Sequence, residues 1–231
     1  MGEGYDWVNV DKREYLDPVD FDMGYKLHES MWTGDRFFPK NHLLGALYAL
    51  LATDWKDDQI IFLGDETTIT EHDTNPVLQK ILTQERQYGQ PAHFTYDLCK
   101  DISGLFKAAE AEVRADIQSM IEYGAFETNY YKVDLNAPFD GLFTRDSIFF
   151  RYTMNHTKKE FYDMGKYYVN GFTDSSNPIP RFNPLPVLMA FGKKAIHKYD
   201  GCWLGDHIGV SNAPPPQTYK NMSETYLTMD W

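Results

Sequence analysis

The chain has 231 residues, a formal net charge of −12 and an aromatic content of 16%. This length fits one large domain or two small ones, and a single compact domain of this size buries enough surface to fold without a metal or disulfide staple. The acidic balance argues against nucleic acid or an anionic membrane as the partner, because both attract clustered Lys and Arg. It is compatible with plain solubility, with a basic protein partner or with mimicry of a nucleic acid.

The start of the chain and its cysteine usage predict a cytoplasmic protein. Residues 1–7 have neither a basic start nor an apolar run, so we expect no signal peptide. The longest apolar stretch, residues 43–52, is too short to span a bilayer. Cys99 and Cys202 lie far apart without CxxC spacing, which favours a reducing compartment.

Apolar periodicity predicts the elements of the first half of the chain. Residues 5–10 alternate apolar and polar side chains, which indicates a half-buried strand, and residues 14–16 return as its partner. Residues 41–53 carry Leu at spacings of three and four and predict a helix. The apolar run 59–63 predicts a buried strand, and a helix with Pro76 in its first turn follows over residues 74–88.

The second half is predicted from the same signals and from capping motifs. The longest helix is expected over residues 103–123, with strands at 130–133 and 147–152. Thr157-Lys158-Lys159-Glu160 has capping-box form, so a helix is expected from residue 157 to about 171. A proline-rich loop, a helix and a strand follow at residues 175–186, 186–199 and 203–210.

These elements predict an α+β fold, in which a mixed or antiparallel sheet of short aromatic-rich strands is covered by about four or five helices. We expect one domain over residues 1–231. A weaker boundary lies near residues 134–140, where Asn, Pro and Gly cluster, and residues 212–231 form a C-terminal tail.

A short pattern recurs in which an aromatic residue lies three positions before an acidic residue. The copies begin at Trp32, Trp55 and Trp203, with a looser one at Phe143. Gly34 and Gly205 permit left-handed backbone at such a turn. We expect each turn to carry its Trp into the core while Asp35, Asp58 and Asp206 accept hydrogen bonds from nearby backbone N–H groups.

The same carboxylates have a second interpretation. If Asp35, Asp58 and Asp206 converged, they could bind Mg²⁺ or Ca²⁺ or include an acid–base pair. Asp65, which follows the predicted strand 59–63, could join them in a metal-assisted hydrolase. The sequence has no HExxH, paired CxxC, phosphate-binding glycine loop or nucleophile elbow, so it supports neither a zinc site nor a standard nucleotide site. The leading interpretation therefore includes no metal or cofactor.

Two segments carry a resemblance to other proteins. They are Trp7-Val8-Asn9-Val10-Asp11-Lys12-Arg13-Glu14-Tyr15 and Trp55-Lys56-Asp57-Asp58-Gln59-Ile60, the latter followed by Gly64-Asp65. The chain resembles a loose group of uncharacterised bacterial proteins with a W-V-N-x-x-K-[RK]-E-[YF] start and a W-x-G-D-x-I…G-D motif. Asp57 stands where that group usually has Gly. The resemblance covers about the first third of the chain and implies no activity, so it transfers no catalytic residue.

Three functions are compatible with the sequence. The leading hypothesis is an acidic, non-enzymatic interaction protein, for example an immunity or antitoxin-like protein, that docks a basic partner on an acidic, aromatic patch. One alternative is a metal-assisted hydrolase built on the turn carboxylates. The other is a small-ligand binder with an aromatic pocket.

Overall fold

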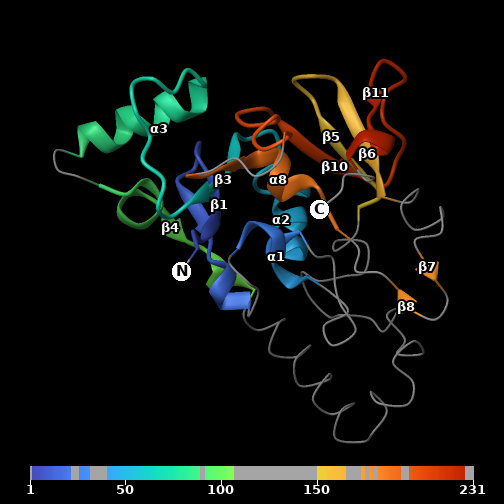
Figure 1. Cartoon of the computed structure of the whole chain (residues 1–231), viewed down its shortest axis with the longest axis horizontal. Coiled ribbons are helices and arrows are strands. Elements are labelled where there is room, and N and C mark those ends of the chain that lie inside the picture. Colours follow the sequence, from blue (N-terminus) through green and yellow to red (C-terminus); the bar gives the residue numbers. More distant parts are fainter. Residues whose placement is uncertain are drawn as a thin grey trace, which may run out of the picture.

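The computed structural model describes residues 2–21, 26–31, 41–88, 92–106, 150–164, 173–174, 177–178, 182–193 and 198–226 (Figure 1). Several predictions fall outside these residues. They are the turn with Trp32, Gly34 and Asp35, the looser copy at Phe143, the strand 130–133, the boundary near 134–140 and most of the helix expected over 103–123.

The first sheet is built around β1 (Tyr5–Asn9) and has the order β4-β2-β1-β3-β9. Its other strands are β2 (Glu14–Leu16), β3 (Ile60–Gly64), β4 (Lys100–Asp101) and β9 (Ala190–Phe191). β1 runs antiparallel to β2 and β3, whereas β4 and β9 add parallel edges. The sheet is therefore mixed, and its last strand comes from a distant part of the chain.

The second sheet is built around β5 (Tyr152–Asn155) and has the order β10-β5-β6-β11. Its other strands are β6 (Glu160–Asp163), β10 (Ile208–Ser211) and β11 (Lys220–Asn221). β5 runs antiparallel to β6 and β10, and β11 lies parallel to β6. A separate antiparallel pair joins β7 (Thr173–Asp174) to β8 (Asn177–Pro178).

Helices pack on both sheets, and two of them pack on the sheet that the other half of the chain forms. The helices are α1 (Leu27–Ser30), α2 (His42–Ala52), α3 (Pro76–Gln87), α8 (Leu185–Met189) and α9 (Ser223–Tyr226). Shorter 3-10 turns occupy Pro18–Phe21 and Ser103–Leu105, and a π-helix spans Phe94–Leu98. α2 packs against β10, whereas α8 packs against β3. No helix in the described ranges is long and apolar enough to cross a membrane.

The first sheet has an apolar core on each face because its central strands are buried on both sides. Ile60 and Phe62 point into the larger core, which the second sheet, α2 and α8 share. Ile61 and Leu63 point to the opposite face, where α3 covers them. This two-sided burial explains why residues 60–63 are continuously apolar and do not alternate.

The predicted α+β class is confirmed, and so are several of its elements. The helix expected over 41–53 is α2, which Asn41 caps by accepting a hydrogen bond from Leu44 N. The helix expected over 74–88 is α3, which Asn75 caps. The apolar run 59–63 is β3.

Three predicted elements in the second half of the chain were wrong. The expected helix after Thr157 is instead a hairpin turn followed by β6, and Lys159 has a φ of 54° that a right-handed helix cannot contain. The helix expected over 186–199 ends at Met189, because the next two residues extend the open edge of β3. The strand expected from Trp203 begins only at Ile208, after a turn in which Gly205 has a φ of 79°.

Candidate functional site

The two tryptophan turns that the structure describes both place their indole in the core. Trp55 and Trp203 are fully buried. Each backbone N–H donates to a carbonyl near the C-terminal end of a helix: Trp55 N to Leu50 O of α2 at 2.7 Å and Trp203 N to Leu188 O of α8 at 2.8 Å. Each indole Nε1 donates to a glutamate that begins a strand: Trp55 to Glu14 Oε2 at 2.9 Å and Trp203 to Glu160 Oε2 at 3.3 Å.

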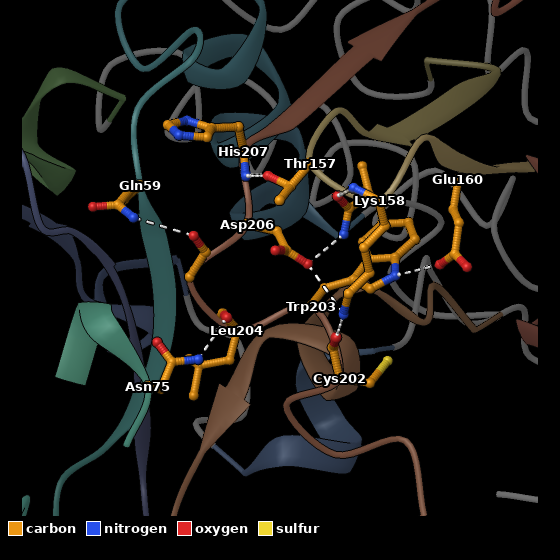
Figure 2. A network of polar contacts seen from close by, with 12 residues as sticks. Gln59, Asn75, Thr157, Lys158, Glu160, Cys202, Trp203, Leu204, Asp206 and His207 are labelled. Carbon is orange, nitrogen blue, oxygen red and sulfur yellow. Dashed lines mark hydrogen bonds and ion pairs between the residues drawn. The ribbon is translucent and has the colours of Figure 1, made fainter. Parts of the chain in front are cut away.

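Each described turn carboxylate binds an asparagine and a lysine side chain from a hairpin that lies far away in the sequence. Asp206 Oδ2 accepts from Asn155 Nδ2 at 2.7 Å. It also lies 3.2 Å from Lys158 Nζ (Figure 2). Asp58 Oδ2 accepts from Asn9 Nδ2 at 2.8 Å and lies 3.3 Å from Lys12 Nζ. Each carboxylate therefore ties its turn to a distant hairpin, which differs from the local backbone capping expected from the sequence.

The same five residue types thus make the same contacts twice. We call Asn9, Lys12, Glu14, Trp55 and Asp58 the N-terminal brace, and Asn155, Lys158, Glu160, Trp203 and Asp206 the C-terminal brace. Sequence reasoning missed the second hairpin, although a signal was present. Residues 155–163 repeat the Asn-x-x-Lys-[Arg/Lys]-Glu-[Tyr/Phe]-x-Asp spacing of residues 9–17.

The carboxylates proposed for a metal-assisted hydrolase do not form a metal site in the described part of the chain. Asp58 and Asp206 each face a lysine, and Asp65 Oδ1 accepts a hydrogen bond from Gly4 N at 2.7 Å. No group of three His, Cys, Asp or Glu side chains in these residues has the arrangement of a metal site. Asp35 lies outside the described residues.

A second cluster of polar groups surrounds Tyr96, on the π-helix Phe94–Leu98. Tyr96 is 52% exposed, yet its hydroxyl donates a 2.9 Å hydrogen bond to Oδ2 of Asp6, which is only 5% exposed. The Tyr96 ring stacks on His93, with centroids 4.6 Å apart, and meets Tyr15 edge-on at 6.1 Å. An exposed aromatic ring is thereby held in one orientation by contacts on several sides.

Negative charge gathers around this ring. We call the set Asp6, Tyr15, Asp17, Asp65, His93, Tyr96, Asp97 and Asp101 the Tyr96 cluster. Burial, with smaller contributions from the charges of Asp17, Asp65 and Asp101, raises the pKa of Asp6 to about 7 against the lowering effect of the Tyr96 hydroxyl. Burial and nearby carboxylates, Asp101 first, raise the pKa of Tyr15 to about 12.

The histidine of the cluster is held by its own segment. His93 N donates to Asp97 Oδ2 at 2.7 Å, which orders the start of the π-helix. Burial lowers the pKa of the His93 imidazole, although Asp65 and Asp97 act in the opposite direction. Sequence analysis anticipated an acidic, aromatic patch in general terms. It did not find this one, because Asp6 and Tyr96 are 90 positions apart.

No protein family model, curated protein or solved structure matches this chain. The fold and the contacts define only the structural class of this protein. It is an α+β protein with two similarly braced sheets and an acidic, tyrosine-bearing cluster on the first of them.

Proposed function

We propose that this chain is a non-enzymatic binding protein that docks a basic protein partner on the Tyr96 cluster. The observation that carries the proposal is the exposed Tyr96 ring, which is fixed above the buried Asp6 carboxylate. Asp65, Asp97 and Asp101 are exposed beside it. An immunity or antitoxin-like role against a basic toxin domain is the concrete form of this proposal.

The chemistry of the cluster suits lysine or arginine side chains of a partner. A cation placed over a tyrosine ring gains a favourable interaction that strengthens when water is excluded. The surrounding carboxylates add ion pairing and accelerate the encounter with a positively charged surface. The ring is already held in place, so little side-chain entropy is lost on binding.

The two rival functions receive less support from the described residues. A hydrolase on the turn carboxylates would have to break the braces, because Asp58 and Asp206 are committed to Asn and Lys partners. Small-ligand binding in an aromatic pocket stays a prediction, and a thermal-shift screen with metabolites would detect it.

The proposal is tested by affinity capture from the native host with three forms of the full chain. The first is the wild type, and the second carries Tyr96→Ala with Asp97→Asn and Asp101→Asn. The Asn residues keep the acceptor oxygens that cap His93 N and Ser103 N while removing two charges. The third, a control, carries Asp54→Asn with Glu71→Gln, which removes the same charge from exposed sites elsewhere.

A basic protein recovered by the wild type and the control, but lost by the cluster variant, is the expected result. Its association rate should fall steeply as salt increases, because steering by exposed charges is screened. Recovery of the same proteins by all three forms would contradict the proposal. So would a captured partner that is acidic.

A further inference from the structure

The equivalence of the two halves extends beyond the braces to their edge strands. Lys100 N donates to Arg13 O and Lys220 N donates to Lys159 O, both at 2.8 Å. These bonds place β4 beside β2 and β11 beside β6 with the same parallel register. One serine after each edge strand then accepts from the end of the hairpin: Asp17 N to Ser103 Oγ and Asp163 N to Ser223 Oγ, both at 2.8 Å.

The backbone repeats as well. Arg13 and Lys159, which precede the brace glutamates, have φ values of 55° and 54°. Asp57 and Gly205, which precede the brace aspartates, have φ values of 65° and 79°. Left-handed backbone is uncommon for residues other than glycine, so its recurrence at matching positions indicates one local design used twice.

The two halves meet through equivalent residues. Gln59 and His207, each next to a brace aspartate, form an antiparallel bridge with one another. Gln59 Nε2 donates to Gly205 O at 3.1 Å, and His207 Nδ1 donates to Asp57 O at 2.7 Å. In these contacts, a residue of one half binds a residue of the other half, and the two equivalent residues bind each other in the same way. Such reciprocal contacts are characteristic of a twofold axis.

The packing of helices is reciprocal in the same sense. α2, from the first half, packs against β10 of the second sheet, and α8, from the second half, packs against β3 of the first. An asparagine lies close to the start of each helix: Asn41 Oδ1 accepts from Leu44 N and caps α2, and Asn183 Oδ1 accepts from Leu185 N, the first residue of α8. The larger core accordingly contains side chains of α2 and α8 together with side chains of both sheets.

We propose that the chain is a tandem of two copies of one self-recognising module, so that the natural partner of a module is a second copy of itself. The N-terminal module comprises the described residues between 5 and 106, and the C-terminal module those between 152 and 226. The contact surface is isologous, which means that both modules use the same patch, and Gln59 and His207 lie at its centre. It also includes α2 and α8, each of which packs on the sheet of the other module. A chain with a single module would form a homodimer through this surface.

The copies differ where the proposed binding function lies. The brace register aligns Tyr15 with Phe161, and the edge strands align Asp101 with Asn221. At these two positions the C-terminal module therefore lacks the phenol of Tyr15 and the carboxylate of Asp101, which the N-terminal module contributes to the Tyr96 cluster. The tandem architecture does not depend on that function.

The test exchanges equivalent residues between modules in the full chain. The exchange variant carries Asp11→Thr and Gln59→His together with Thr157→Asp and His207→Gln. Asp11 Oδ2 accepts from Gln59 N as Thr157 Oγ1 accepts from His207 N, so each bond is rebuilt in the other module. A scrambled control carries Asp11→Gln, Gln59→Asp, Thr157→His and His207→Thr. It has the same composition and likewise loses the Lys80–Asp11 ion pair.

The melting temperature should fall by no more than roughly 4 °C in the exchange variant, because only an exposed ion pair is lost. It should fall by roughly 8 °C or more in the scrambled control. The carboxylate from Gln59→Asp cannot donate to Gly205 O, and the short hydroxyl from His207→Thr does not reach Asp57 O as the imidazole does. Equal losses in the two variants would overturn the proposal. A scrambled control as stable as the wild type would do the same.

Discussion

The hydroxyl of Tyr96 donates a 2.9 Å hydrogen bond to Oδ2 of Asp6, a buried carboxyl group in the central strand of the first sheet. This contact links the proposed binding surface directly to the core. A change in the charge of Asp6 must therefore affect both the stability of the fold and the seating of the exposed ring.

Replacing Asp6 by Asn should stabilise the protein in a pH-dependent way. Burial raises the Asp6 pKa from 3.8 to about 7 in the folded state. A carboxyl with a raised pKa stabilises the fold at low pH, and this contribution is lost as the pH rises through 7. The stability gain of Asp6→Asn should grow by about 2–3 kcal/mol between pH 5 and pH 8. Urea unfolding at both pH values measures it, with Asp54→Asn as control. A gain independent of pH would contradict the assignment.

The brace aspartates should matter more for stability than their lysine partners. Removing Asp206, whose side chain is 12% exposed, leaves Asn155 Nδ2 without its acceptor inside the structure. We expect Asp206→Ala to lower the free energy of unfolding by about 2–3 kcal/mol. Lys158→Met should lower it by less than about 1 kcal/mol, because Lys158 is 42% exposed. Denaturant titration of the two variants checks this order, and the reverse order would show that the ion pair dominates.

Asp57 and Gly205 occupy equivalent left-handed positions but should respond differently to substitution. Asp57→Gly removes the strain of a φ of 65° and should stabilise the protein by about 0.5–1 kcal/mol. Gly205→Ala should destabilise it, because the added Cβ would lie 2.8 Å from Asn75 Oδ1. That oxygen caps α3, and the Asn75 amide donates to Leu204 O (Figure 2). Differential scanning calorimetry should show melting shifts of opposite sign.

The two cysteines should be slow to react in the folded protein. Burial raises the pKa of the Cys99 thiol to about 12, with Arg13 acting in the opposite direction, and burial also raises the pKa of Cys202. Only the thiolate is strongly nucleophilic, so modification by a disulfide reagent at pH 7.5 should be at least about tenfold slower than in urea. Equal rates in native and denaturing buffer would show that both thiols are accessible and unperturbed.

The sequence by itself determined the elements whose signals are local. Leu periodicity with a capping Asn marks α2, Asn75 before Pro76 marks α3, and a run of four apolar residues marks β3. Local signals gave a wrong prediction where the same residue spacing is compatible with two different backbone structures. Thr157-Lys158-Lys159-Glu160 has the form of a helix cap, but the same spacing serves a hairpin turn that delivers Glu160 to Trp203.

Only the tertiary structure decided what the acidic residues do. Residue spacing placed Asp58 and Asp206 in turns, but their partners Asn9 and Asn155 are 49 and 51 positions away. The contact between Asp6 and Tyr96 spans 90 positions and has no periodic signal. Hydrophobic pattern and capping report on neighbours along the chain, whereas charge pairing depends on which strands become adjacent, and that follows from packing of the whole core.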